Sequence, residues 1–232
     1  MKLPLLSLAL LLVGVCLPCS AQEKEMVTVR FLSFPKSVRP EPVQLQIGGG
    51  KVIEVKAPSN SLSPAYQVPR LNQWSVGKVE LNEEQKPVYT EYGNAPSIAS
   101  KDQLILLIRK GKKNEDGLQV MPMDNSADNF AGGEFFFMNA ARVDIAGILG
   151  GNKFMLKPGS HSVIKPGELI KRGEGQMEKV FTQFFFKNAT AEAKEFFSST
   201  WPANKKARSM IFFYHDTHSK RLRFHTVRDF MP

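Results

Sequence analysis

Apolar and polar residues alternate along much of the chain with a period of two, as they do in strands that bury one face. Residues 27–31 (Val-Thr-Val-Arg-Phe) and residues 43–47 (Val-Gln-Leu-Gln-Ile) show this alternation. Residues 104–108 (Leu-Ile-Leu-Leu-Ile) are instead continuously apolar, which predicts a short central strand buried on both faces. Glycine and proline separate such segments, so the pattern predicts an all-β protein.

Two stretches of the chain resemble each other, and the second begins about a hundred residues after the first. The first opens with residues 31–34 (Phe-Leu-Ser-Phe) and the second with residues 135–138 (Phe-Phe-Phe-Met), and each continues into a glycine-rich turn. Two copies are too few for a solenoid, so the similarity predicts tandem domains. About seven short strands in each copy match a β-sandwich. We therefore expect two tandem immunoglobulin-like (Ig-like) β-sandwich domains that arise from an internal repeat, Ig-like in architecture alone.

The stretch most typical of a linker is residues 125–133 (Asn-Ser-Ala-Asp-Asn-Phe-Ala-Gly-Gly). The predicted organisation is a signal peptide over 1–21, a first sandwich over 22–124, a linker over 125–133 and a second sandwich over 134–232. The predicted inner faces of the first sandwich are Val27, Val29, Phe31, Val43, Leu45, Ile47 and residues 104–108. Those of the second are Phe135, Phe137, Phe184, Phe186, Ile211 and Phe213.

One segment has a helical pattern, so the prediction includes at most one short helix, over residues 190–197. Four residues that include good helix formers (Ala-Glu-Ala-Lys, residues 191–194) follow an N-cap candidate, Asn188 or Thr190.

Consecutive phenylalanines cannot all face one core, because neighbouring side chains on a strand point to opposite faces. Phe136 and Phe185 each lie between two phenylalanines, so both are expected to point away from the core of the second sandwich. We expect them to make a buried contact between the domains. A surface for a protein partner is the alternative.

The N-terminus has the features of a secretory signal. Lys2 precedes an apolar stretch over residues 5–15 that is too short to span a bilayer, and small residues at Cys19 and Ala21 predict cleavage after Ala21. No later segment reaches the ~18 apolar residues of a membrane helix. We expect export to a periplasm, a cell surface or the medium. Because Cys16 and Cys19 are the only cysteines, cleavage removes every disulfide, thiolate metal site and cysteine nucleophile.

The chain is basic, with a formal net charge of +9 and a pI near 9.5. Such a charge favours anionic partners outside the cytoplasm, namely an acidic polysaccharide, lipopolysaccharide phosphate, anionic lipid or extracellular nucleic acid. Nothing in the sequence points to specific nucleic-acid recognition. The alternative is that the charge serves only solubility.

Histidine and motif patterns give no sign of catalysis or of a cofactor. A metal site would have to combine His215, Asp216, His218 and His225. In a hairpin centred near His218, however, His215 would face Arg221 and His225 would lie ~13 Å from the turn, so we expect no metal site beyond a weak one at the turn. No nucleophile elbow or zinc-protease helix occurs. We therefore expect no catalytic residues, no cofactor and no enzymatic activity.

The closing hairpin of the chain carries the most suggestive surface. Basic residues precede the hairpin, lie at its turn and alternate along its last strand, and Arg228 follows them. This pattern predicts a stripe for an anionic ligand, with Tyr214 and Trp201 as stacking groups. The candidate residues are Lys205, Lys206, Arg208, Lys220, Arg221, Arg223 and His225. The alternative is a solvated strand face whose charges prevent pairing with another sheet edge.

These observations favour an exported, non-catalytic, two-domain binding or structural module of the cell envelope, which engages an anionic polysaccharide or lipid through the second domain. The second hypothesis is an interaction or assembly module, similar to a chaperone, that pairs strand edges with a protein partner. An enzyme with an unrecognised site is the third.

Overall fold

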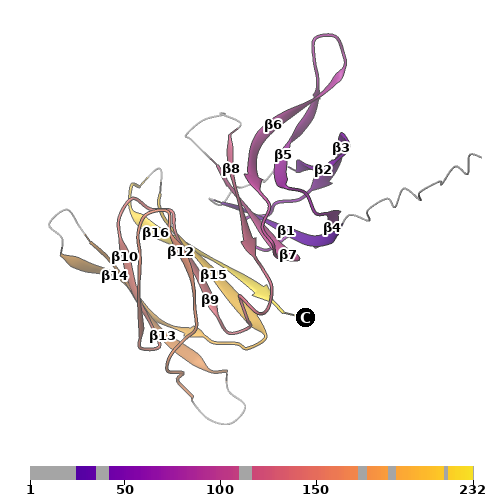
Figure 1. Cartoon of the computed structure of the whole chain (residues 1–232). Coiled ribbons are helices and arrows are strands. Elements are labelled where there is room, and N and C mark those ends of the chain that lie inside the picture. Colours follow the sequence, from indigo (N-terminus) through magenta and orange to yellow (C-terminus); the bar gives the residue numbers. More distant parts are fainter. Residues whose placement is uncertain are drawn as a thin grey trace, which may run out of the picture.

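The computed structural model describes residues 25–34, 42–109, 117–171, 177–187, 192–216 and 219–231. Within these residues the chain forms sixteen β-strands in four sheets of four, and no helix (Figure 1). This confirms the all-β prediction. In the same residues no helix is long and apolar enough to cross a membrane. The predicted signal peptide lies outside the described residues.

The first half of the chain forms two sheets. Its strands are β1 (Met26–Phe34), β2 (Val43–Gly48), β3 (Lys51–Val55), β4 (Tyr66–Pro69), β5 (Gln73–Leu81), β6 (Pro87–Pro96), β7 (Asp102–Arg109) and β8 (Leu118–Asp124). Inner sheet 1 has the order β4-β1-β7-β8 and outer sheet 1 the order β3-β2-β5-β6. Strands β1 and β7 run parallel, and every other pair is antiparallel.

The second half has the same strand order. Its strands are β9 (Phe135–Asn139), β10 (Ile145–Leu149), β11 (Asn152–Leu156), β12 (His161–Ile164), β13 (Lys179–Lys187), β14 (Ala193–Pro202), β15 (Ala207–His215) and β16 (Leu222–Phe230). Inner sheet 2 is β12-β9-β15-β16 and outer sheet 2 is β11-β10-β13-β14. The parallel pair, β9 and β15, again joins the first and seventh strands of the half.

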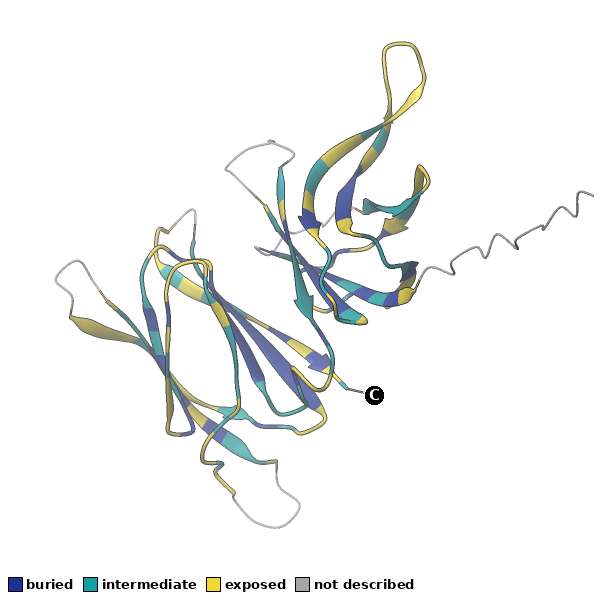
Figure 2. Cartoon of the chain, in the orientation of Figure 1, coloured by how far each residue is buried: buried dark blue, intermediate teal, exposed yellow. Residues whose placement is uncertain are grey.

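Three apolar clusters hold the four sheets together as successive layers. The first cluster fills the space between outer and inner sheet 1, and the third does so between inner and outer sheet 2. The second cluster lies between the two inner sheets, where Phe34 of β1 stacks on Phe212 of β15 with 5.1 Å between ring centroids. The inner sheets are thus covered on both faces, as the buried strands in Figure 2 show.

Strand β7, whose residues 104–108 are all apolar, is buried on both faces, as the sequence predicts. Ile105 and Leu107 of β7 belong to the first cluster, whereas Leu104 and Leu106 belong to the second. The other predicted inner faces are also confirmed, since each of those residues belongs to the first or third cluster. Phe136 lies in the second cluster between the halves, as expected.

The predicted linker is built into the contact between the halves. The Asn125 side chain donates to the Asp102 carboxylate at 2.9 Å, and Phe130 is buried in the cluster between the inner sheets. Burial would raise the pKa of Asp124, but hydrogen bonds from the Ser126 N–H and the Ser100 hydroxyl outweigh it and lower that pKa. Asn125 and Phe130, at the two ends of residues 125–130, are therefore part of the packed junction.

The predicted helix over residues 190–197 is wrong, because β14 begins at Ala193 and continues to Pro202. Residues 188–191, with both N-cap candidates, lie outside the described residues. Phe197 and Trp201 of β14 pack in the core between inner and outer sheet 2, and β14 pairs along its length with β13. Aromatic burial on a sheet thus overrides the helix propensity of the preceding residues.

The predicted register of the closing hairpin is wrong by one residue. His215 lies opposite Leu222, because Asp216 pairs with Arg221 through a 2.9 Å backbone hydrogen bond. The observed register places Phe213 opposite Phe224, and both rings belong to the cluster between inner and outer sheet 2.

Replacing Gly147 with alanine is expected to lower the free energy of unfolding by about 1–3 kcal/mol, the usual cost of overpacking. Gly147 lies directly opposite Phe154, and a methyl group there would clash with the Phe154 ring. The ring cannot easily retreat, because its centroid is 4.6 Å from that of Phe137. Denaturant titration measures the cost, and Gly147→Ala/Phe154→Leu should recover part of it. An unchanged midpoint for Gly147→Ala would contradict this packing.

Candidate ligand-binding pocket

The structure divides the predicted basic stripe between the two ends of β15. Lys205 and Lys206 immediately precede this strand, whereas Lys220 and Arg221 follow its far end. The strand has nine residues, so its ends are about 26 Å apart at ~3.3 Å per residue. The seven predicted residues therefore do not form one continuous binding surface.

Two of the predicted residues, Arg208 and His225, already have polar partners at the junction between the halves. Arg208 is only 3% exposed, and its guanidinium pairs with Asp229 at 2.9 Å. The same group donates to the carbonyl oxygens of Asn125 and Phe130 at 2.8 and 2.9 Å. The His225 Nε2 atom lies 2.8 Å from the Ser59 carbonyl oxygen in the first half. Neither Arg208 nor His225 thus belongs to the solvent-facing basic surface.

The turn of the closing hairpin remains exposed and basic. Lys220 and Arg221 are exposed, while Arg223 pairs with Asp216 at 3.5 Å. No group of three metal-ligating side chains occurs among the residues that the structure describes, and His218 lies outside them. This end of the sheet is charged, but neither of the two cavities described below lies there.

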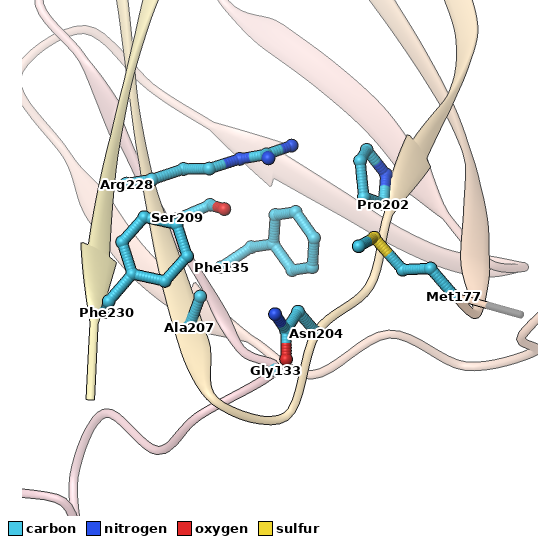
Figure 3. A pocket seen from close by; sticks show the side chains of 9 residues that line it. All are labelled: Gly133, Phe135, Met177, Pro202, Asn204, Ala207, Ser209, Arg228 and Phe230. Atoms are coloured by element: carbon cyan, nitrogen blue, oxygen red, sulfur yellow. The ribbon is translucent and has the colours of Figure 1, made fainter. Parts of the chain in front are cut away.

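A pocket opens at the other end of inner sheet 2, beside the start of β15 (Figure 3). Its volume is about 110 Å³. The lining residues come from β9, β14, β15, β16 and the turns beside them: Gly133, Phe135, Met177, Pro202, Asn204, Ala207, Ser209, Arg228 and Phe230. Two of the apolar side chains are open to solvent, since Met177 is 55% and Phe230 68% exposed.

The alternation of β16 explains why the pocket mixes rings with a cation. Phe224, Arg228 and Phe230 share one face of the strand, the face directed at outer sheet 2. Near Phe224 that face is covered by aromatic rings of β13 and β14. These rings do not extend over Phe230, which is 68% exposed. Arg228 and Phe230, on the same face of β16, therefore line an open pocket.

Arg228 supplies the positive charge of the pocket. Its side chain reaches across the opening, past Ser209 and Phe135, toward Pro202 (Figure 3). No ion pair joins Arg228 to any acidic residue in the described part of the chain. A guanidinium offers five N–H donors in a fixed planar arrangement that matches a carboxylate or phosphate. The pocket can therefore bind an acidic group beside an apolar body.

A second cavity of about 280 Å³ adjoins the first at Gly133. Lys165 and Lys205 line it together with Glu134 and Glu178. Both acids already have partners, because Glu134 accepts from the Ala131 N–H at 2.9 Å and Glu178 pairs with Lys171 at 3.7 Å. Lys165 and Lys205 have no ion pair within the described residues, so together with Arg228 they bring three cations to the two cavities, against the carboxylates of Glu134 and Glu178.

The predicted stripe ends with Arg228 but does not count it among the candidate binding residues, whereas Lys205, which is counted, lines the adjoining cavity. Phe135, Met177 and Phe230, the apolar lining of the pocket, are absent from the predicted site. The alternating Phe224, Arg228 and Phe230 were the available sequence signal. That signal does not reveal where the covering sheet ends.

Comparisons with known proteins supply no further guide. No protein-family model matches the chain, and no curated protein matches it.

Proposed function

We propose that this protein is an exported, non-catalytic two-domain binding module of the cell envelope, and that it binds an anionic ligand at Arg228. The observation that carries the proposal is the Arg228 guanidinium, which forms no ion pair with any described residue and lies across an open, partly aromatic pocket. Arginine binds carboxylates through two parallel hydrogen bonds, which gives both affinity and orientation. The ligand site thus moves from the predicted hairpin stripe to the opposite end of the same sheet.

The size of the pocket restricts the ligand. Its volume of about 110 Å³ is below the ~300 Å³ of sites that enclose a whole small molecule. One acidic group fits beside Arg228, while the rest of the ligand extends along the adjoining cavity of about 280 Å³, which Lys205 lines. A carboxylated envelope polysaccharide has this form, because each charged unit is one substituent of a long chain.

The two halves are proposed to be copies of one unit, joined by the linker at residues 125–133. The identical strand orders of the two halves support an origin by internal duplication. Each half has eight strands rather than the seven expected, and its first strand pairs with the fourth and seventh strands. The likeness to an Ig domain therefore concerns the layered architecture and not the strand order.

The test is the binding of polygalacturonate, a carboxylated polysaccharide, to residues 22–232. Arg228→Glu is expected to reduce affinity by about tenfold or more, because a hydrogen bond to a charged group contributes about 1.5–3 kcal/mol. Arg221→Glu is the matched control, since it makes the same charge change at the other end of the sheet and should bind nearly as the wild type does. Calorimetry at low and high salt measures both variants.

Three results would overturn this proposal. Absence of binding by the wild-type protein would exclude this ligand class, and equal losses in the two variants would show that charge alone matters. A loss confined to Arg221→Glu would return the site to the predicted hairpin stripe.

Edge-strand pairing with a protein is a second candidate function. Strand β14 has ten residues, pairs only with β13 and is largely exposed (Figure 2). A long edge strand with free backbone groups is a template for another strand. Binding of a partner by this route should persist at high salt and in Arg228→Glu, whereas binding at the pocket should not.

A further inference from the structure

The solvent-facing surface of outer sheet 2 is apolar at its centre. The register places Met155, Ala146 and Phe185 side by side across three strands, and Ile148 and Phe181 lie on the same face. Met155 is 57% and Phe181 39% exposed. Phe185, which the sequence predicts to contact the other domain, belongs to this surface and to none of the three buried clusters.

Lysines border this apolar centre. Along β13 the outward residues read Lys179, Phe181, Gln183, Phe185 and Lys187, and Lys153 of β11 lies beside Ile148. The acid that β14 contributes to this face, Glu195, accepts a 3.1 Å hydrogen bond from Gln183. We call this surface the lysine-bordered face; its defining residues are Met155, Ile148, Phe181 and Phe185 with Lys153, Lys179 and Lys187.

The corresponding face of outer sheet 1 shows that the architecture does not require apolar residues there. In the first half the matching row is Glu54, Gln44, Gly77 and Glu91. Three of the four are polar, and the Gln44 side chain accepts from the Val79 N–H at 2.6 Å. Gly77 is the exception: the Tyr89 ring lies against it, and the Tyr89 hydroxyl donates to the Gln44 carbonyl oxygen at 3.3 Å. The row that contains Met155 and Phe185 in the second half is therefore mostly polar in the first half.

An exposed apolar surface surrounded by polar residues marks a contact with a protein or a membrane. The charge distinguishes between these partners. Lys153, Lys179 and Lys187 border the apolar centre, so its surroundings are positively charged. The long aliphatic part of a lysine side chain can place the ammonium group among lipid headgroups while the apolar centre lies deeper. Anionic lipid complements both features, because its headgroups attract lysine and its acyl region accepts methionine and phenylalanine.

We propose that the lysine-bordered face docks the protein on an anionic lipid surface, with Met155 and Phe181 entering between the headgroups. This goes beyond binding at Arg228, which lines a different surface. The two sites allow the protein to rest on a lipid surface while it holds a soluble anionic polymer.

The experiment is co-sedimentation of residues 22–232 with vesicles of phosphatidylcholine alone or mixed with phosphatidylglycerol. The wild-type protein is expected to sediment only with the mixed vesicles. The triple variant Lys153→Glu, Lys179→Glu and Lys187→Glu should lose more than about tenfold in vesicle affinity, since each lysine near an anionic surface contributes. Met155→Gln/Phe181→Gln keeps every charge and should lose about tenfold, because the inserted apolar surface is removed.

The matched control places the same charge change on the first half, in Lys51→Glu, Lys56→Glu and Lys86→Glu. All three lysines are exposed, and one of them, Lys86, pairs with Glu84 at 2.7 Å, so the control makes the same formal charge change away from the lysine-bordered face. This control should retain most of the binding, and thermal unfolding should show that both triple variants remain folded. Equal losses in the two triple variants would overturn the proposal in favour of net charge.

Other outcomes also decide the matter. Failure of the wild-type protein to bind mixed vesicles would overturn the proposal. A dimer that Phe181→Gln dissociates, without vesicle binding, would assign the face to a second copy of the chain. Vesicle binding retained in Arg228→Glu, together with loss of polygalacturonate binding, would show that the two sites are independent.

Discussion

Replacing Arg208 with leucine is expected to lower the free energy of unfolding by about 3–5 kcal/mol, the usual cost of removing one partner of a buried ion pair. Asp229 is buried, and after the substitution its remaining cation would be Arg30, at 3.4 Å. The carbonyl oxygens of Asn125 and Phe130 would also lose their charged donor. The substitution therefore destabilises the junction at which residues 125–130 contact inner sheet 2.

Thermal unfolding measures this effect, and a fall in Tm of about 10 °C is expected for a chain of this size. Arg221→Leu removes an exposed arginine from the same hairpin and should change stability by less than ~0.5 kcal/mol. Arg208→Leu/Asp229→Leu should recover part of the loss, because no charge is then left buried alone. If Arg208→Leu unfolds at the wild-type temperature, the network does not stabilise the junction.

The same network shows why the predicted binding stripe was only partly useful. From the sequence, Arg208 and Lys206 are two basic residues at one strand end. In the structure Arg208 faces the first half and is bonded on every side, whereas Lys206 is exposed. Whether a charged side chain is free depends on what packs against it, and that packing involves Asn125 and Phe130, about eighty residues earlier.

The strands and their buried faces were more accessible to sequence reasoning, because alternation is a local signal. Residues 104–108 even revealed a strand covered on both faces. The sequence did not reveal that two such strands, β7 and β15, belong to adjacent inner sheets that cover each other. Local propensity failed at residues 193–197, where the pairing of Phe197 with Phe184 on β13 decides the conformation.

The four-layer arrangement also limits where the protein can bind anything. Inner sheets 1 and 2 are buried on both faces by the three clusters. Binding is therefore left to the outer faces, the free strand edges and the open sandwich ends. Two places of this kind in the described part of the chain, the pocket at Arg228 and the lysine-bordered face, combine exposed apolar side chains with positive charge.

The core that supports both surfaces depends on Phe184, and Phe184→Ala is expected to cost about 3–5 kcal/mol of unfolding free energy. The ring is fully buried. It lies 4.8–6.4 Å, between centroids, from the rings of Phe137, Phe154, Phe196, Phe197, Trp201, Phe213 and Phe224. These rings come from both sheets of the second sandwich, so the truncation leaves a cavity that no single neighbour can fill.

Phe181→Ala is the matched control, because it removes the same ring three positions earlier on the same strand. Phe181 points to solvent on the lysine-bordered face, so its loss should cost less than about 1 kcal/mol. Denaturant titration of both variants separates the two roles: Phe184→Ala should lower the midpoint strongly, and Phe181→Ala should instead weaken vesicle binding. Equal stability losses would mean that Phe181 is a core residue, and the lysine-bordered face would then lose its apolar centre.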